Sequence, residues 1–200
     1  MLGHMATVDH KERRRLIVAN AMRLFASMGF AKVSFLDISK STGLARTALY
    51  RYFKTKREIF DEAIHAITSG IRFELGRIAA MDASAAKRME ASCSTVIDAM
   101  YGKKEFFSAI YEFVFSMARS GHDMAERIEQ FTGGFKVALR NLVKEGVSTG
   151  EFRRNVDPEA ATEALYALME SVALRVMLGV EKDPTRAKRR FGAVISDFVA

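Results

Sequence analysis

The sequence of 200 residues predicts an all-α fold of about nine helices, arranged as an N-terminal three-helix domain and a C-terminal helical bundle. Apolar residues recur at helical spacing along most of the chain, which is the main signal for amphipathic helices. Both prolines follow an aspartate, at Asp157-Pro158 and Asp183-Pro184, and hairpin signals such as Asn-Gly are missing. Hydrophobic residues make up 49% of the chain, which is enough to build a packed core.

The first predicted helix covers about residues 10–28. One face of it carries Ile17, Ala21 and Phe25 at helical spacing. We expect residues 1–9 to be disordered or, in their first part MLGHM, the remnant of a cloning tag.

Two short helices separated by a tight turn are predicted next, which is the pattern of a helix-turn-helix. The Ser34 hydroxyl suits an N-cap, and Asp37 stands where the acid of a capping box belongs. The first short helix therefore runs over about residues 35–41. Gly43 suits the left-handed conformation that ends such a helix, and the second helix starts near Ala45.

The two short helices are expected to share a small core and to present an outward face. Apolar side chains at three positions are spaced to pack between the helices: Ile38, Leu44 and Leu49. The side chains left pointing outward are those of Arg46, Thr47 and Tyr50.

A longer helix is predicted from Lys56 to about Ile78. Thr55 and Glu58 form a second capping box ahead of its apolar pattern, and its positive N-terminal end suits a phosphate group. In each Asp-Pro pair the aspartate caps a helix and the proline fits its first position. The remaining helices are expected at about 86–101, 104–119, 123–147, 158–179 and from 184 onward, with breaks at 102, 121 and 146–150.

Positive charge is concentrated in the segment that holds the helix-turn-helix. Residues 1–60 carry 12 Lys and Arg against 4 Asp and Glu, whereas residues 61–200 carry 19 against 20. A cation field confined to one domain is typical of binding to the phosphate backbone of a nucleic acid. The alternative, a tag or a solubilising surface, fits less well because Arg46, Arg51 and Lys54 lie within the motif itself.

The segment LFASMGFAKVSFLDISKSTGLARTALYRYFKTKREIF resembles the N-terminal DNA-binding domain of the TetR family of bacterial transcriptional regulators. The match covers about residues 10–60. Its elements are Gly29-Phe30, Ile38, Gly43 and the run Leu49-Tyr50-x-Tyr52-Phe53-Lys54-x-Lys56. By this resemblance, Arg46 and Thr47 contact base edges. The positions that the resemblance assigns to phosphate contacts are Ser34, Tyr50, Tyr52 and Lys56.

The motif departs from the family pattern at the second short helix. Ala45 stands where a Ser or Thr cap is usual, which should cost about 1 kcal/mol of local stability. Thr47-Ala48 replaces the usual Gly-Thr pair. The resemblance further implies that residues 10–56 form the DNA-binding domain and residues 57–200 a ligand-binding and dimerisation domain.

The helix predicted over 158–179 is apolar on more than one side, although a single core needs only one apolar face. The extra face includes Ala164, Ala167 and Ser171, which suggests contact with a second copy of the chain. The resemblance likewise implies a homodimer joined by the last two helices of each chain. The residues predicted at this interface are Ala164, Leu168, Val172, Phe191, Val194 and Phe198.

The segment 104–119 places apolar residues almost all round a helix, more than packing against one neighbour requires. An ordinary core rich in Phe and Met is one interpretation. The resemblance implies instead a pocket for a lipophilic or aromatic small molecule, with Tyr111, Glu112 or His122 as a polar group. The candidate pocket residues are Ile71, Met100, Phe107, Ile110, Tyr111, Val114, Phe135 and Met169.

These observations predict a ligand-responsive transcriptional regulator, a repressor that binds a palindromic operator in double-stranded DNA as a dimer and is released by a small molecule. The alternative is an architectural DNA-binding protein without a ligand. The two differ in whether specific affinity exceeds nonspecific affinity by several orders of magnitude.

Other function classes lack support in the sequence. No His-x-x-x-His, Cys-x-x-Cys, Gly-rich phosphate loop or Gly-x-Ser-x-Gly occurs, so we expect no enzyme, cofactor or metal site. Charges interrupt every long apolar stretch, and no apolar run precedes the charged residues 10–15, so neither a membrane span nor a signal sequence is expected. The single cysteine, Cys93, favours a reducing cytoplasm, and we assign it to packing rather than to thiol sensing.

Overall fold

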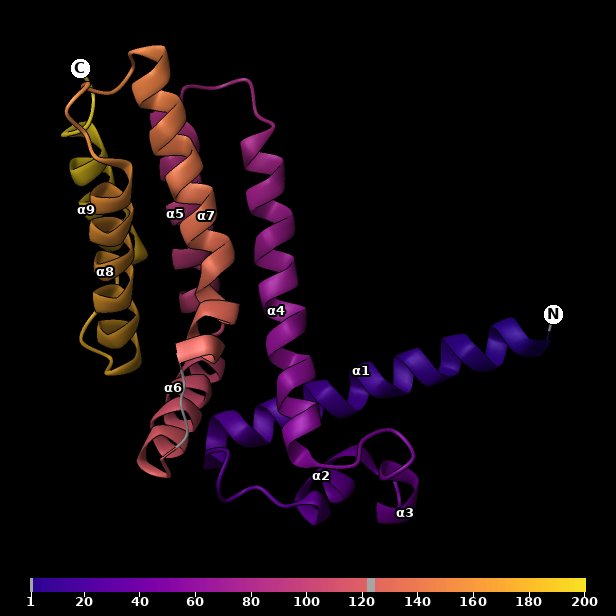
Figure 1. The fold of residues 1–200 in the computed structure, drawn as a ribbon. Helices are drawn as coiled ribbons and strands as arrows, with labels where there is room; N and C mark the ends of the chain where they lie inside the picture. Colours follow the sequence, from indigo (N-terminus) through magenta and orange to yellow (C-terminus); the bar gives the residue numbers. More distant parts are fainter. Residues whose placement is uncertain (1, 122–124) are drawn as a thin grey trace. The chain divides into compact units, whose positions relative to one another are not determined.

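The computed structural model describes the backbone of residues 2–121 and 125–200, and the side chains of residues 10–121, 126 and 128–200. Within these ranges the regular structure is helical, which confirms the predicted all-α fold (Figure 1). The helices are α1 Leu2–Met28, α2 Phe35–Thr42, α3 Arg46–Leu49, α4 Lys56–Ala79, α5 Ala85–Gly102, α6 Lys104–Arg119, α7 Ala125–Thr149, α8 Pro158–Met177 and α9 Pro184–Ser196.

Helix starts follow the capping signals of the sequence. Asp157 Oδ1 accepts a hydrogen bond from the Ala160 N–H at 2.8 Å, and α8 begins at the adjoining proline as predicted. Asp183 caps α9 in the same way, through the Thr185 N–H at 2.8 Å. This backbone hydrogen bond is the main reason that the pKa of Asp183 lies below its ordinary value.

Two helix boundaries differ from the prediction. α1 begins at Leu2 rather than at about residue 10. α7 continues through Gly146, where a break was predicted, and ends before Gly150, whose φ is +79°. Gly146 lies inside this helix, and the ring of Phe152 occupies the space that a Cβ at this position would take. The predicted start of this helix at residue 123 lies outside the described residues.

The chain folds as two compact units. One, here called unit 1, comprises Met1–Ile67 and Ser108–His122, and the other, unit 2, comprises Thr68–Phe107 and Asp123–Ala200. α4 and α6 therefore each contribute residues to both units. This division differs from the boundary at residue 56 that the resemblance implies, because the first part of α4 and most of α6 group with the N-terminal helices.

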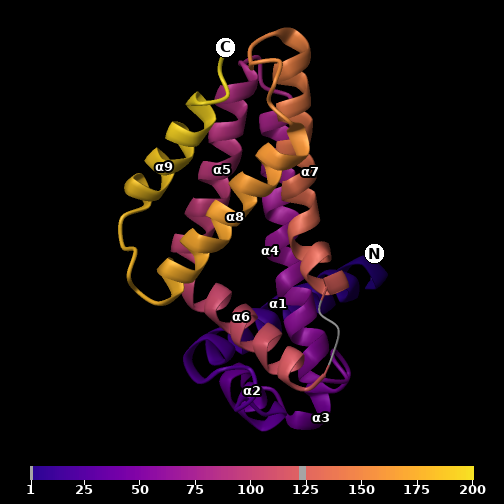
Figure 2. The ribbon, with the colours of Figure 1, turned by 60° about the vertical axis from the view of Figure 1, so that its left-hand side comes forward.

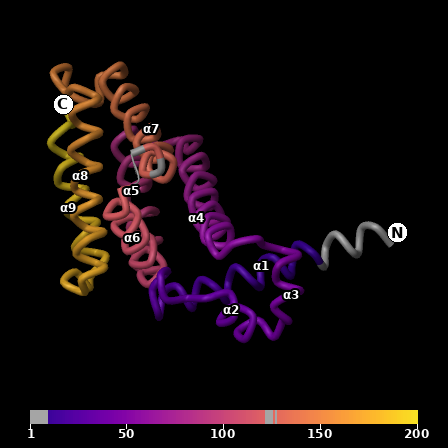
Figure 3. Tube along the Cα trace, turned by 60° about the horizontal axis from the view of Figure 1, so that its bottom comes forward, coloured from indigo at the N-terminus to yellow at the C-terminus, as the bar shows by residue number. Residues whose placement is uncertain are grey.

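Unit 1 is held together by an aromatic cluster. α1 contacts α2, and α2 contacts α3 (Figure 3). Beside them, the ring of Phe60 from α4 lies 5.4 Å from that of Phe25 and 5.0 Å from that of Phe113 on α6. Phe30, in the loop after α1, lies 4.8 Å from Phe113. Ring pairs at these distances interact favourably beyond the area that they bury, so this cluster joins α1, α4 and α6.

Unit 2 is a helical bundle. α5 lies against α7, α8 and α9, and α8 also contacts α7 and α9 (Figures 1 and 2). Cys93 of α5 is buried at 1% exposure, and burial raises the pKa of its thiol, in agreement with a packing role. None of the helices in the described part of the chain is long and apolar enough to span a membrane.

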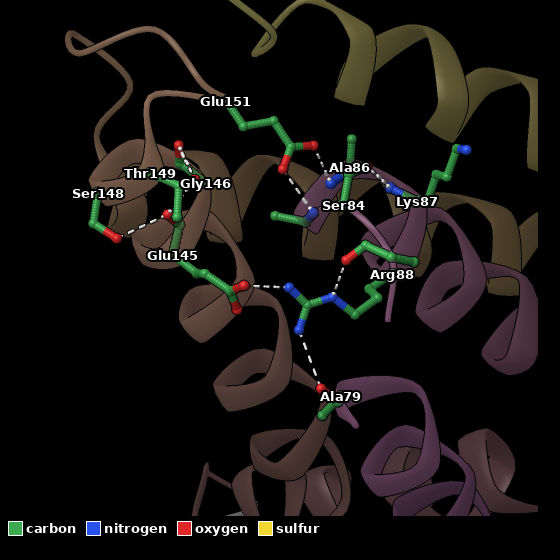
Figure 4. Close-up of polar contacts among 12 residues, drawn as sticks. Ala79, Ser84, Ala86, Lys87, Arg88, Glu145, Gly146, Ser148, Thr149 and Glu151 are labelled. Carbon is green, nitrogen blue, oxygen red and sulfur yellow. Dashed lines mark hydrogen bonds and ion pairs between the residues drawn. The ribbon is translucent and has the colours of Figure 1, made fainter. Parts of the chain in front are cut away.

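A cluster of polar contacts joins the start of α5 to the segment that follows α7 (Figure 4). A carboxylate oxygen of Glu151 accepts from the Ala85 N–H at 2.7 Å, and the other accepts from the Ala86 N–H at 2.9 Å. Burial by itself raises the pKa of Glu151, but the hydrogen bonds outweigh it and hold the pKa below its ordinary value. Glu151 thus acts as a distant N-cap for α5.

Arg88 makes a second set of contacts in the same cluster (Figure 4). Its Nε donates to the Ala83 carbonyl at 2.9 Å, and its Nη1 donates to the Ala79 carbonyl at 3.1 Å. Its remaining nitrogen forms an ion pair with Glu145 of α7. One guanidinium thereby connects the end of α4, the start of α5 and α7.

Candidate nucleic-acid interface

The turn between α2 and α3 has the geometry that the sequence predicts. Ser34 Oγ accepts from the Asp37 N–H at 3.2 Å, and Asp37 Oδ2 accepts from the Ser34 N–H at 2.9 Å, which completes the capping box. The hydrogen bonds from Ser34 are also the main reason that the pKa of Asp37 is below its ordinary value. Gly43 follows α2 with a φ of +68°, a conformation that favours glycine.

The α3 helix presents the predicted outward face. Ile38 and Leu49 are fully buried at 0% exposure, so the shared core of the two short helices is present. Arg46 and Thr47 are exposed, and the Tyr50 residue is 38% exposed. Ala45 precedes the helix in an extended conformation and supplies no side-chain cap, as its residue type requires.

Tyr50 and Arg46 are not independent on this face. The Tyr50 ring stacks on the Phe35 ring, with centroids 4.8 Å apart and planes 14° apart. Arg46 Nη2 donates to the Tyr50 hydroxyl at 3.3 Å. Phe35 was not predicted from the sequence, because only the fold brings the first residue of α2 beside the end of α3.

Ser34 and Tyr52, two other predicted phosphate contacts, also have partners within the chain. The Ser34 hydroxyl, although exposed, is engaged in the capping box and donates to Asp37 Oδ2 at 2.6 Å. Tyr52 is half-buried, and its ring lies 4.8 Å from that of His10 on α1. Both roles in phosphate binding stay predictions.

Lys56 differs most from its predicted environment. Its Nζ donates to three carbonyls of the loop after α1, those of Phe30 at 2.8 Å, Ala31 at 3.0 Å and Val33 at 2.9 Å. Nζ also lies 4.6 Å from the centroid of the Phe30 ring. Burial lowers the pKa of Lys56, yet only the ammonium form supplies all three donors. We infer that Lys56 positions this loop, because its ammonium donates to three loop carbonyls, and its role in phosphate binding stays a prediction.

Replacing Lys56 by methionine tests this inference. Because three loop carbonyls lose their donor, we expect the free energy of unfolding to fall by about 1–3 kcal/mol in urea titrations. Lys40→Met, at an exposed position of α2, is the matched control and should change it by less than about 0.5 kcal/mol. Unchanged stability together with a weaker salt dependence of DNA binding would instead identify Lys56 as a phosphate ligand.

Arg14 of α1 also supports the helix-turn-helix, although the sequence analysis counted it only as part of the basic segment. Its Nη1 donates to the Tyr52 carbonyl at 2.6 Å, and its guanidinium lies 4.2 Å from the centroid of the Phe53 ring. It also pairs with Glu62 of α4. Arg14 thereby ties the segment after α3 to α1 and α4.

The predicted ligand-binding residues are divided between the two units. In unit 2, Met100, Phe135 and Met169 are buried on α5, α7 and α8, and Ile71 and Phe107 are half-buried. The other three lie on the part of α6 that belongs to unit 1, where each is half-buried: Ile110, Tyr111 and Val114. Of the polar candidates, Glu112 lies against Gly29 at the end of α1, and His122 lies outside the described residues.

The predicted dimer residues need a correction. Val172 and Phe191 are buried at 0% and 1% exposure in unit 2, so they belong to the chain's own core. Ala164 is exposed, and Leu168, Val194 and Phe198 are half-buried. The extra face that was predicted on α8, with Ala164, Ala167 and Ser171, is exposed, and Leu174 extends it to a stripe of small and apolar residues.

The buried core that α2 and α3 share, the exposed Arg46 and the basic N-terminal segment define a helix-turn-helix DNA-binding protein. The family model for bacterial regulatory proteins of the tetR family matches residues 17–63, and that for the C-terminal domain of BetI-type transcriptional repressors matches residues 85–200. The chain belongs to the TetR family of bacterial transcriptional regulators.

Individual relatives agree with this assignment. The HTH-type transcriptional regulator PksA of Bacillus subtilis (strain 168) is 25% identical over 193 residues, covering 96% of this chain and 90% of PksA. A TetR-family regulator from Rhodococcus sp. superimposes with a TM-score of 0.77 at 20% identity, over 94% of this chain and 100% of that structure. FadR of Bacillus subtilis, solved in complex with stearoyl-CoA, gives 0.73 at 19% identity, over 92% and 98%. These structural matches show the shared fold.

Proposed function

We propose that this regulator is a repressor in the bacterial cytoplasm that binds a palindromic operator as a homodimer and releases it when a lipophilic or aromatic small molecule binds. The observation that carries the DNA-binding part is the exposed face of α3, where Arg46, Thr47 and Tyr50 lie opposite the buried Ile38 and Leu49. Arg46 supplies the donors that suit a guanine edge in the major groove. Flanking basic residues supply the attraction to phosphates.

The exposed stripe on α8 supports the homodimer. Leu174 is 48% exposed, and small residues precede it on the same face at Ala164, Ala167 and Ser171. Small side chains allow close approach of a second helix, and a twofold axis brings the same stripe of each chain together. Two copies then present their α3 helices to successive major grooves, about 34–36 Å apart.

The composition of unit 2 supports an apolar ligand. Met100, Phe135 and Met169 are buried on three different helices, and methionine adapts to irregular apolar shapes. Stearoyl-CoA in the FadR structure is consistent with a lipophilic molecule for this fold. We propose that the ligand contacts these residues, with Ile71 and Phe107 beside them.

We propose that ligand binding shifts α6, and that this shift changes the DNA-binding helices so that DNA is released. Phe113 of this helix lies 4.8 Å from Phe30 and 5.0 Å from Phe60, so a shift of α6 must disturb the aromatic cluster beside α1. Such coupling is typically worth about 1–3 kcal/mol between the two states. An operator affinity that stays unchanged when a bound small molecule saturates the protein would contradict it.

Replacing Arg46 by alanine tests the DNA-contacting role. On a duplex enriched by the wild-type protein from a randomised library, we expect a loss of about 1–3 kcal/mol, because a bidentate base contact disappears. The loss on a scrambled duplex of equal length should be smaller. Arg154→Ala, at an exposed position of unit 2, is the control and should change neither affinity. Equal losses on both duplexes for Arg46→Ala would remove Arg46 from base recognition.

A further inference from the structure

The geometry points to Phe35 as a positioning residue that determines DNA specificity: its ring supports Tyr50, and Tyr50 in turn orients Arg46 toward the bases. This inference rests on the proposed role of Arg46 in base recognition. It assigns a function to an aromatic residue of α2 that the sequence motif does not include.

The need for such support arises from α3 itself. The helix spans only Arg46–Leu49 and begins after Ala45, which supplies no side-chain cap. Helices this short are marginal without tertiary contacts. Leu49 anchors one side of α3 in the core, but Arg46 and Tyr50 lie on the exposed side, where a long arginine has many accessible rotamers.

The stack restricts that freedom in two steps. The rings of Phe35 and Tyr50 are nearly parallel, 14° apart in plane and 4.8 Å apart in centroid, which is a favourable arrangement for two aromatic side chains. The Tyr50 hydroxyl then accepts from Arg46 Nη2 at 3.3 Å, and the guanidinium carbon lies 5.8 Å from the Tyr50 centroid. The chain of contacts from Phe35 to Tyr50 to Arg46 thus favours one position of the guanidinium before DNA arrives.

Phe35 is itself held on a rigid element. It is the first residue of α2, directly after the Ser34 capping box, and Ile38 one turn later is fully buried. Phe35 is only half-buried, so it is not part of that core. A side chain fixed by a rigid helix and stacked on a contact residue is the arrangement that preorganised sites require.

The first experiment compares Phe35→Leu with Phe35→Tyr. Leucine keeps an apolar side chain and removes the flat stack, whereas tyrosine keeps the ring. The quantity measured is the specificity ratio, defined as the dissociation constant for a scrambled duplex divided by that for the duplex enriched by the wild-type protein. We expect Phe35→Leu to lower the ratio about tenfold, and Phe35→Tyr to stay within about twofold of wild type. Phe73→Leu, at a 68% exposed position of α4, is the matched control and should leave the ratio unchanged.

The second experiment repeats Phe35→Leu in the Arg46→Ala background. If Phe35 acts through Arg46, its replacement should then change the ratio by less than about twofold, because residues in one contact network do not act additively. Tyr50→Leu removes the stack from its other side and should also lower the ratio. Tyr50→Leu replaces Phe35→Leu in the experiment if Phe35→Leu lowers the thermal unfolding midpoint so far that its DNA binding cannot be measured.

The outcomes separate this inference from the proposed function. A wild-type protein that enriches no sequence would overturn both. A wild-type protein with a clear preference that Phe35→Leu retains would overturn the role of Phe35 alone. The same is true if Phe35→Leu lowers the ratio by an equal factor with and without Arg46, since Phe35 would then act independently of it.

Discussion

Replacing Phe60 by alanine is expected to lower the free energy of unfolding by about 3–5 kcal/mol, the usual range for a buried phenylalanine. Phe60 is 0% exposed, and its ring lies between those of Phe25, Phe30 and Phe113, at centroid distances of 5.4, 5.0 and 5.0 Å. Alanine would leave a cavity at the point where α1, α4 and α6 meet. Chemical denaturation followed by circular dichroism measures the loss.

The matched control lies on the same helix. Phe73 of α4 is 68% exposed, so Phe73→Ala removes an equal number of atoms without opening a cavity and should change the unfolding free energy by less than about 0.5 kcal/mol. Similar losses for the two substitutions would show that the aromatic cluster contributes no more than an exposed ring, contrary to the packing described for unit 1.

The second large effect is expected at Arg88. Arg88→Ala should lower the free energy of unfolding by about 2–4 kcal/mol, because it removes the donors to the Ala79 and Ala83 carbonyls and leaves Glu145 without its cation. We expect a smaller loss of unfolding free energy than for a fully buried ion pair, because the Glu145 side chain is 44% exposed. The same denaturation measurement applies.

Arg77→Ala serves as the control for Arg88. The Arg77 side chain is 68% exposed and pairs with Glu74 three residues earlier on α4, an arrangement worth only about 0.2–0.5 kcal/mol. If both arginine substitutions cost this little, Arg88 does not connect α4, α5 and α7 as its hydrogen bonds indicate.

Local signals explain why much of the fold was predictable. Ser34, Gly43, Asp157 and Asp183 act on backbone groups within a few residues of themselves, so their effects are encoded in a short stretch of sequence. The exposed position of Arg46 followed from the same logic, because the spacing of Ile38 and Leu49 fixes which side of each short helix is buried.

The supporting contacts were not predictable in this way, because they join residues far apart in the sequence. Lys56 has three carbonyl partners between 23 and 26 positions away, and no local pattern distinguishes such a lysine from a phosphate ligand. Phe113 belongs to unit 1 and its ring contacts that of Phe60, although more than 50 residues separate the two in the sequence. Likewise, periodicity showed several apolar faces on α8 but not that Val172 faces the chain's own core.

The most direct test of the central claim, that α3 presents a base-contacting face to duplex DNA, is selection of binding sites by the wild-type protein from a randomised duplex library. We expect enrichment of one inverted repeat, with half-site centres about one helical turn apart or a multiple of it. The enriched duplex should bind at least about 10³-fold more tightly than its scrambled counterpart at physiological salt. Enrichment of no sequence, with equal affinity for all duplexes, would contradict the account.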